Sequence, residues 1–201
     1  AARGAAAAPA EGPVYRACAA VTLPAFAAYA CLFCLQHEVK VVYGIADDDS
    51  PASHAFSAAT SSLFAFKLVF RFLHSVLFGC LPPRGRLYIG MGMLAAAMAL
   101  LAGVTALALA PRPGYVYAAY ALGGAGIGSF EGNVLAALTF LGPDSKKYGV
   151  MGMPLGVSMV TIGAFLLRYW GVPVCAIYAA SIALLAVSAV VLRLAIPREE
   201  A

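Results

Sequence analysis

Long apolar stretches alternate with short polar breaks along the whole chain. A helix that crosses the apolar core of a bilayer needs about 20 residues, and six stretches reach that length. They cover residues 14–37, 52–80, 87–110, 114–141, 148–170 and 172–196. The pattern therefore predicts an all-α polytopic membrane protein, with six transmembrane helices over 13–197 between a disordered tail at 1–12 and a short tail at 198–201.

The breaks between these stretches contain residues that begin or end helices. Ser50 can cap the second helix through its hydroxyl, with Pro51 at the first helical position. Proline, glycine and charged residues separate the later stretches, in LPPRGR (81–86), APRPG (110–114), GPDSKK (142–147) and YWGVP (169–173). The predicted helix ends therefore rest on local chemistry as well as on hydropathy.

Composition indicates lipid surroundings and argues against several classes of function. Hydrophobic residues make up 63% of the 201 residues and charged residues 11%, with a mean hydropathy of +0.88, which is unlike a soluble domain. The basic residues are scattered, so nucleic-acid binding is not expected.

CLFC (31–34) has no second cysteine pair or histidine cluster and is interpreted as two small buried thiols. Because no nucleophile–base pair, metal cluster or cofactor motif is present, we expect neither an enzyme nor a resident cofactor.

Basic residues are shared unevenly between the two sides of the predicted bundle. Six spans place both termini on the same side, together with the second and fourth loops. Eight basic residues fall there: Arg3, Arg16, Arg84, Arg86, Lys146, Lys147, Arg193 and Arg198. The other side holds Lys40, Arg112 and Arg168 beside the acidic residues Asp47, Asp48 and Asp49. The positive-inside rule then predicts that both termini face the cytoplasm, stroma or matrix.

Two further basic residues lie inside the second predicted helix, where charge is costly. A charged side chain at the bilayer centre costs at least about 2.5–3.5 kcal/mol on insertion scales. Lys67, Arg71 and His74 are spaced i, i+4 and i+7, so they share one helical face, which Thr60 extends. Such a face points into a bundle or a water-filled cavity. We therefore predict that Lys67, Arg71 and His74 contribute to a substrate-binding site.

A carboxylate lies at a similar depth in the fourth predicted helix. Glu131, within GGAGIGSFEGN (123–133), can neutralise Lys67 or Arg71 while lining the same cavity. The same residues could instead form a structural ion pair that fixes helix register and binds nothing. Two cations against one anion leave one positive charge, whereas a structural site would balance its charges. The excess charge favours a site for a small anionic solute that includes Glu131.

The glycines around Glu131 are interpreted as helix-packing residues. The third glycine is one place short of the dinucleotide-binding pattern, so that motif is not matched. Spacing by four residues is the pattern that lets membrane helices approach closely. It occurs at Gly124, Gly128 and Gly132 in the fourth helix, and at Gly152 and Gly156, on either side of Pro154, in the fifth. Gly149 and Gly163 are assigned the same role.

These features together resemble one half of a major facilitator superfamily transporter. FGCLPPRGRLYIG (78–90) is similar to that family's loop G-x-x-x-D-R-x-G-R at Gly79 and at Arg84-Gly85-Arg86, with Pro82 and Pro83 near the place of the acidic residue. GVMGMPLG (149–156) resembles its glycine–proline motif. The resemblance implies secondary transport through a cavity lined by helices one, two, four and five. It also implies a partner, since the family has two six-helix halves: a second half or a second copy.

A different function is compatible with the same sequence. The chain could be a non-catalytic structural subunit of a large membrane complex, such as a photosynthetic or respiratory assembly, and could then bind pigment or lipid. The alanine-rich, arginine-bearing start AARGAAAAPAEGP resembles the remnant of a transit peptide, which favours a plastid or mitochondrion. Long apolar faces without a continuous polar cavity would distinguish this function from transport.

Overall fold

The computed structural model describes residues 11–46, 49–107, 113–139 and 143–196, and over these residues it contains helices and no strand. The helices are α1 (Glu11–Cys34), α2 (Gln36–Val42), α3 (Pro51–Leu77), α4 (Pro83–Leu107), α5 (Pro113–Thr139), α6 (Pro143–Tyr169) and α7 (Val174–Leu194). The first predicted stretch, 14–37, corresponds mainly to α1, while the short helix α2 begins near its end and continues beyond it; each other stretch forms one helix. The described residues thus form seven helices, six of them of at least 21 residues and one, α2, of seven residues, where the sequence predicted six transmembrane helices.

The helix α1 begins at Glu11, inside the segment predicted as a tail. The remainder of that tail, residues 1–10, lies outside the described residues, and so does the predicted tail at 198–201.

Five of the helices contain segments long and apolar enough to cross a membrane. These segments are Arg16–Cys34, Pro51–Leu77, Pro83–Ala106, Ser145–Tyr169 and Val174–Leu194. The helix α5 is as long as α3, at 27 residues, but it is not among these five, because its glycines together with Glu131 and Asn133 interrupt its apolar residues. Much of α5 is covered by other helices, so its composition is not set by contact with lipid. The fold is that of a helical protein embedded in a membrane.

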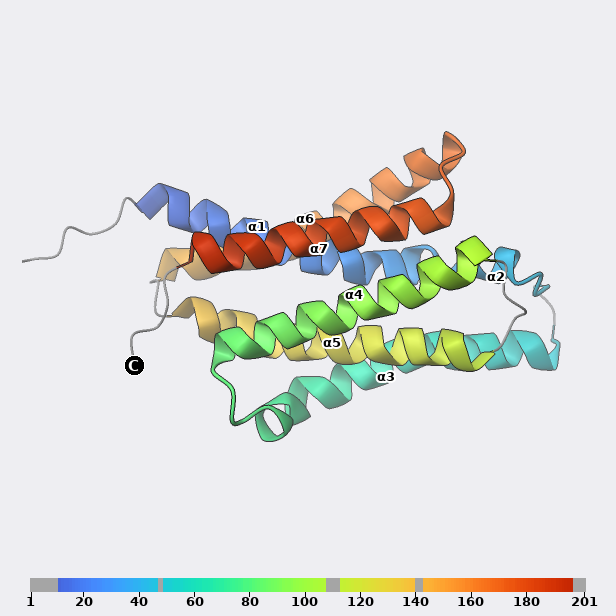
Figure 1. The fold of residues 1–201 in the computed structure, drawn as a ribbon, viewed down its shortest axis with the longest axis horizontal. Coiled ribbons are helices and arrows are strands. Elements are labelled where there is room, and N and C mark those ends of the chain that lie inside the picture. The colour runs from blue at the N-terminus through green and yellow to red at the C-terminus, as the bar shows by residue number, and fades with distance from the viewer. Residues whose placement is uncertain (1–10, 47–48, 108–112, 140–142, 197–201) are drawn as a thin grey trace, which may run out of the picture.

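The helices pack in two groups, which meet where α4 contacts α7 and where α1 contacts α5. In one group α5 lies between α3 and α4; in the other, α1 packs against α6 and α7. Contacts between α4 and α7, and between α1 and α5, join the groups. The helices α3 and α5 run in the same direction, as do α1 and α6 (Figure 1). The start of α1 and the end of α7 lie at one end of the bundle, here named the basic end, and the opposite end is named the far end.

Glycines bring the two parallel helix pairs into backbone contact. A Cβ atom at Gly124 or Gly128 would collide with the α3 carbonyl oxygens of Leu63 and Lys67, respectively. In the other pair, a Cβ at Gly156 would collide with the α1 carbonyl oxygen of Leu23, and one at Gly152 would lie 3.0 Å from that of Ala19. Each interface therefore sets small residues four apart on one helix against carbonyls four apart on its neighbour.

Not every glycine predicted to pack does so. A Cβ at Gly163 would meet nothing within 4 Å, so the packing role assigned to it is wrong. Conversely, Gly90 of α4 and Gly126 of α5 face each other, and a Cβ on either would lie within 3 Å of the other's carbonyl oxygen. Gly126 lies outside the four-residue repeat, and α4 carries no such repeat at Gly90, so spacing alone did not identify this contact.

Several helix ends are closed by side chains. The Ser50 hydroxyl accepts a hydrogen bond from the Ser53 amide at 3.3 Å with Pro51 following, which confirms the predicted cap. Arg86 donates from Nε to the Leu81 carbonyl, 2.9 Å away, just beyond the end of α3. Arg84 donates to the carbonyls of Leu192 and Arg193 in the last turn of α7. The Arg84-Gly85-Arg86 run therefore belongs to the first turn of α4, where Arg84 closes the end of α7 and Arg86 fixes the loop that follows α3.

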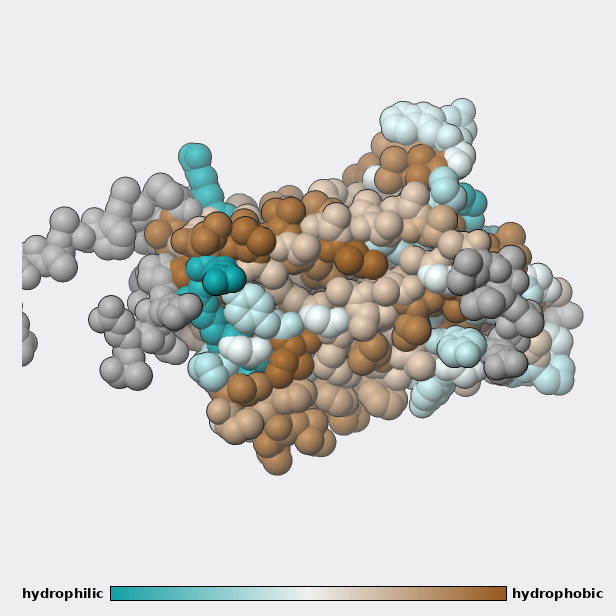
Figure 2. Space-filling model, in the orientation of Figure 1, coloured by the Kyte–Doolittle hydropathy of each residue, from teal (hydrophilic) through white to brown (hydrophobic). Residues whose placement is uncertain are grey.

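The outer surface is apolar along most of the bundle. Figure 2 shows brown and tan residues over its length, with teal and pale blue residues gathered toward the two ends. Large exposed apolar side chains are concentrated on α3, α6 and α7, and include Phe72, Val76, Ile162, Phe165 and Val187. This distribution suits a chain whose sides contact hydrocarbon and whose ends reach water.

Candidate functional site

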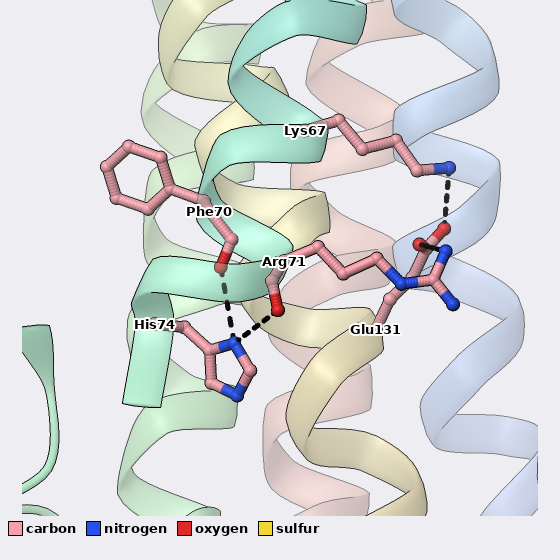
Figure 3. Close-up of polar contacts among 5 residues, drawn as sticks. All are labelled: Lys67, Phe70, Arg71, His74 and Glu131. Carbon is pink, nitrogen blue, oxygen red and sulfur yellow. Dashed lines mark hydrogen bonds and ion pairs between the residues drawn. The ribbon is translucent and has the colours of Figure 1, made fainter. Parts of the chain in front are cut away.

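The three charged residues singled out within the second and fourth predicted helices meet at the α3–α5 interface. The Glu131 carboxylate lies between two cations of α3, with its Oε1 2.7 Å from Lys67 Nζ and its Oε2 3.6 Å from Arg71 Nη1. Figure 3 shows both α3 side chains extending toward Glu131 on α5. Each carboxylate oxygen therefore has its own cation. These three residues are named the charge cluster.

The glycine ridge of α5 positions this cluster. A Cβ at Gly128 would lie 3.1 Å from the backbone nitrogen of Arg71, so the two backbones touch one turn before Glu131. The helices α3 and α5 run in the same direction, and Lys67 and Arg71, four residues apart on α3, follow one another along the length of α5. One carboxylate on α5 can then lie between two cations on α3.

A third helix contributes an aromatic ring to the cluster. Lys67 Nζ lies 4.5 Å from the centroid of the Tyr29 ring of α1, within the range of a cation–π interaction. Tyr29 is only 7% exposed and packs edge-to-face on Phe33 at 5.2 Å. Sequence reasoning missed Tyr29, because no polar or charged neighbour in α1 distinguishes it from the other aromatic residues there.

Exposure differs sharply between the two cations. The side chains of Lys67 and Glu131 are 24% and 12% exposed, whereas that of Arg71 is 59% exposed. Two cations and one carboxylate leave a formal charge of +1 on the cluster. Lys67 is therefore held by the carboxylate and the Tyr29 ring, while the Arg71 guanidinium presents donors to the surroundings. This arrangement can hold an anion through Arg71 while Glu131 keeps the site from carrying two excess charges.

His74 lies beside the cluster without contacting Glu131 through any interaction that the structure records. Its Nδ1 is 2.9 Å from the Arg71 carbonyl oxygen and 3.2 Å from that of Phe70, and its Nε2 is 3.1 Å from Ser75 Oγ. The ring fills the space that a side chain at Gly132 would need. The i+7 spacing placed His74 on the correct face, but one turn beyond the carboxylate. Thr60, two turns before Lys67, is bonded to the Ser57 carbonyl at 3.0 Å.

Sequence reasoning also missed an ion pair at the far end. Arg168 Nη2 of α6 lies 2.6 Å from Glu38 Oε2 of α2, and Arg168 Nη1 donates to the Val172 carbonyl at 2.9 Å. The two side chains are 32% and 28% exposed. Both residues lie at predicted helix ends on the same side of the membrane. That shared position predicts an ion pair only once α1 and α6 are known to be neighbours.

Two cavities of the bundle lie away from the charge cluster. One, of about 630 Å³, is at the basic end between the start of α4 and the end of α7. The other, of about 390 Å³, is at the far end between the loop after α2, the start of α3 and the start of α5. Neither is lined by Lys67, Arg71 or Glu131. The cavity that the sequence predicts around these charges therefore stays a prediction.

The cysteines of CLFC face different helices. Cys31 Sγ lies 3.2 Å from Ser181 Oγ of α7, and Cys34 Sγ lies 3.7 Å from Thr161 Oγ1 of α6. Among the described residues, no group of three or more His, Cys, Asp or Glu side chains is arranged to hold a metal ion.

Comparisons of the chain with protein-family models, with curated proteins and with solved structures found no match. The geometry of the charge cluster is therefore the basis for a functional proposal.

Proposed function

We propose that this chain is one half of a secondary transporter for a small anionic solute, with Arg71 and Lys67 as the anion-binding residues. The observation that supports this most is the excess positive charge of the cluster, together with the 59% exposure of Arg71 beside the partly buried Lys67–Glu131 pair. An exposed cation among apolar helices is costly unless it faces water or a ligand. Glu131 lowers the cost of holding Lys67 and can exchange a proton coupled to solute movement.

The order of helix contacts supports a transporter-like arrangement. The helices α1, α3 and α4 form one triple along the chain, and α5, α6 and α7 form another. The second helix of each triple packs in parallel on the first helix of the other, α3 on α5 and α6 on α1. Internal repeats of three helices are a recurring feature of secondary transporters. The resemblance to the major facilitator superfamily belongs to this proposal.

The proposal includes six membrane crossings and a partner. Sheltered by α3 and α4, α5 crosses the bilayer in spite of its lower hydropathy. The basic end then faces the cytoplasm, stroma or matrix, with both termini on that side. Alternating access needs a second body against which this one moves, so the open side of the charge cluster faces a second half or a second copy.

Anion flux through the purified chain tests the proposal. The protein, purified in mild detergent with any second half or second copy that it retains, is reconstituted into sealed vesicles, and uptake of chloride, nitrate, phosphate and small carboxylates is measured, with vesicles lacking protein as the background. We expect saturable uptake of at least one anion, and we expect Arg71→Gln to abolish it. Arg16→Gln is the matched control, because it removes an exposed cation from α1 outside the cluster. Equal uptake by wild type and Arg71→Gln would refute the proposed role of the cluster.

One observation favours a second candidate, a structural subunit of a larger membrane complex. The cluster lines neither of the two cavities, and α3 and α6 present long apolar faces such as that containing Phe72 and Val76. In this case the cluster fixes the register of α3 against α5, and pigment or lipid covers the apolar faces. Isolation of the native protein in mild detergent separates the candidates, because a subunit will co-purify with constant partners and its vesicles will show no anion uptake.

A further inference from the structure

The cavity at the basic end has an apolar interior and basic residues in its lining. It lies between the start of α4 and the end of α7, with Ala137 of α5, Leu192 and Ile196 as its buried lining. Tyr88 and Val190 form exposed parts of its walls. Its volume, about 630 Å³, is within the range of cavities that enclose small organic ligands.

Two arginines line this cavity. Arg84 is fixed in place, because its Nη2 donates to the carbonyls of Leu192 and Arg193. Arg193 lies in the last turn of α7 and is exposed. The described residues that line the cavity include no aspartate or glutamate. Two basic side chains therefore lie beside an apolar interior, which is complementary to an anionic amphiphile rather than to a neutral or a fully polar ligand.

The position of the cavity identifies the kind of amphiphile. The helices α4 and α7 both contain candidate membrane spans, Pro83–Ala106 and Val174–Leu194, and the cavity lies where the first begins and the second ends. Figure 2 shows teal, hydrophilic residues at this end of the bundle beside brown ones. A cavity at the end of two spans lies level with lipid headgroups, where basic pockets between helices bind anionic headgroups.

We propose that this cavity is a binding site for one anionic phospholipid. Its phosphate is held by Arg84 and Arg193, and the upper part of an acyl chain fills the slot between Tyr88, Ala189 and Val190. The site is independent of the charge cluster, so it holds whether or not the chain transports an anion. Its occupant also packs between α4 and α7 at the end where Arg84 already connects them.

Photochemical labelling of the full chain in mild detergent tests the site. Phosphatidylglycerol and phosphatidylcholine, each with a photoreactive group in one acyl chain, are added in parallel, and labelled peptides are identified by mass spectrometry. We expect preferential labelling by phosphatidylglycerol on the segments around Tyr88 and Val190. One basic residue near a membrane surface contributes about five-fold in affinity for anionic lipid, so Arg193→Gln should lower phosphatidylglycerol labelling by about that factor. Arg16→Gln, which removes the same charge from α1, should leave it unchanged.

Two blocking variants test the slot itself. Ala189→Phe fills it, and Gly85→Leu narrows its mouth at a position where an added Cβ meets only ordinary contacts of 3.6 Å or more. Both variants should abolish labelling while helix content by circular dichroism is unchanged. If one variant misfolds, the other decides. The Arg193→Gln variant tests the same site independently of both. The proposal is overturned by equal labelling with the two lipids, by an equal effect of Arg16→Gln, or by full labelling of a folded blocking variant. Competition by soluble glycerol phosphate at the concentration of the lipid would also overturn it, because the site would then be one for free phosphate.

Discussion

Replacing Glu131 with Gln while Lys67 stays in place should destabilise the fold more than replacing both residues. At 2.7 Å the attraction between Lys67 Nζ and the carboxylate is about 6 kcal/mol for an effective dielectric constant of 20. Desolvation of two side chains that are 24% and 12% exposed offsets much of it, which leaves a net coupling of about 1.5–3 kcal/mol. The single variant Glu131→Gln leaves a partly buried cation without its carboxylate, at a cost of about 3 kcal/mol.

The second pair of the cluster should couple more weakly. Arg71 lies 3.6 Å from the carboxylate and is 59% exposed, so screening reduces its coupling with Glu131 to about 1 kcal/mol or less. The predicted order is therefore Lys67–Glu131 above Arg71–Glu131. If Glu131 only fills space and pairs with neither cation, the two coupling energies would show no such order.

A double-mutant cycle measures both couplings. The variants are Glu131→Gln, Lys67→Met, Arg71→Met and the two doubles, unfolded by sodium dodecyl sulfate in mixed micelles. With Cys34, Cys80 and Cys175 replaced by Ser in every variant, reaction of a thiol reagent with the buried Cys18 and Cys31 reports unfolding. The control cycle combines Lys67→Met with Glu38→Gln, whose carboxylate pairs with Arg168, and should be additive within about 0.5 kcal/mol. Additivity in the Lys67–Glu131 cycle, or a larger coupling for Arg71, would refute the reasoning.

Three further predictions use the same unfolding measurement. Gly128→Ala should destabilise the fold by about 1–3 kcal/mol, because its Cβ meets the α3 backbone. Gly163→Ala, with open space around it, should be neutral or stabilise the fold by up to about 1 kcal/mol. Equal effects of the two variants would contradict the packing description. Ser50→Ala should cost about 1 kcal/mol through loss of the α3 cap, and an unchanged midpoint would show that the cap contributes nothing. Arg168→Gln should cost about 1 kcal/mol, with little further loss when Glu38→Gln is added, and additive losses would show that the two side chains do not interact.

The pairing of Glu131 was accessible to sequence reasoning because a charge at lipid depth needs a partner. Helical spacing put Lys67 and Arg71 on one face, and segment positions put Glu131 at a similar depth. Which cation lies closer depends on the offset between α3 and α5, and that offset is set by backbone contacts at Gly124 and Gly128 that only the structure shows. The sequence alone could therefore name the cluster but not rank its members.

Other features depended on which helices are neighbours, and periodicity does not carry that information. Tyr29 reaches Lys67 only because α1 lies beside the α3–α5 pair, and Glu38 meets Arg168 only because α2 follows α1 alongside α6. The cavity expected around the charges was inferred from the polar face of one helix, and it stays a prediction. The apolar pattern placed α5 among the spans by its length, whereas its glycines and Glu131, which contact other helices, leave it outside the five candidate spans of the structure.

The parallel packing of α3 on α5 has a consequence for biosynthesis. Helices that run in the same direction cannot be neighbours in a hairpin, so α3 must wait for α4 and α5 to be made before its main interface forms. Glu131 follows Lys67 by 131 − 67 = 64 residues, which at ribosomal rates of about 5–20 residues per second is a delay of about 3–13 s. Throughout that interval Lys67 and Arg71 have no carboxylate from α5. Membrane insertion of α3 is therefore less favourable before α5 emerges than in the finished bundle, because its two charges still lack this carboxylate.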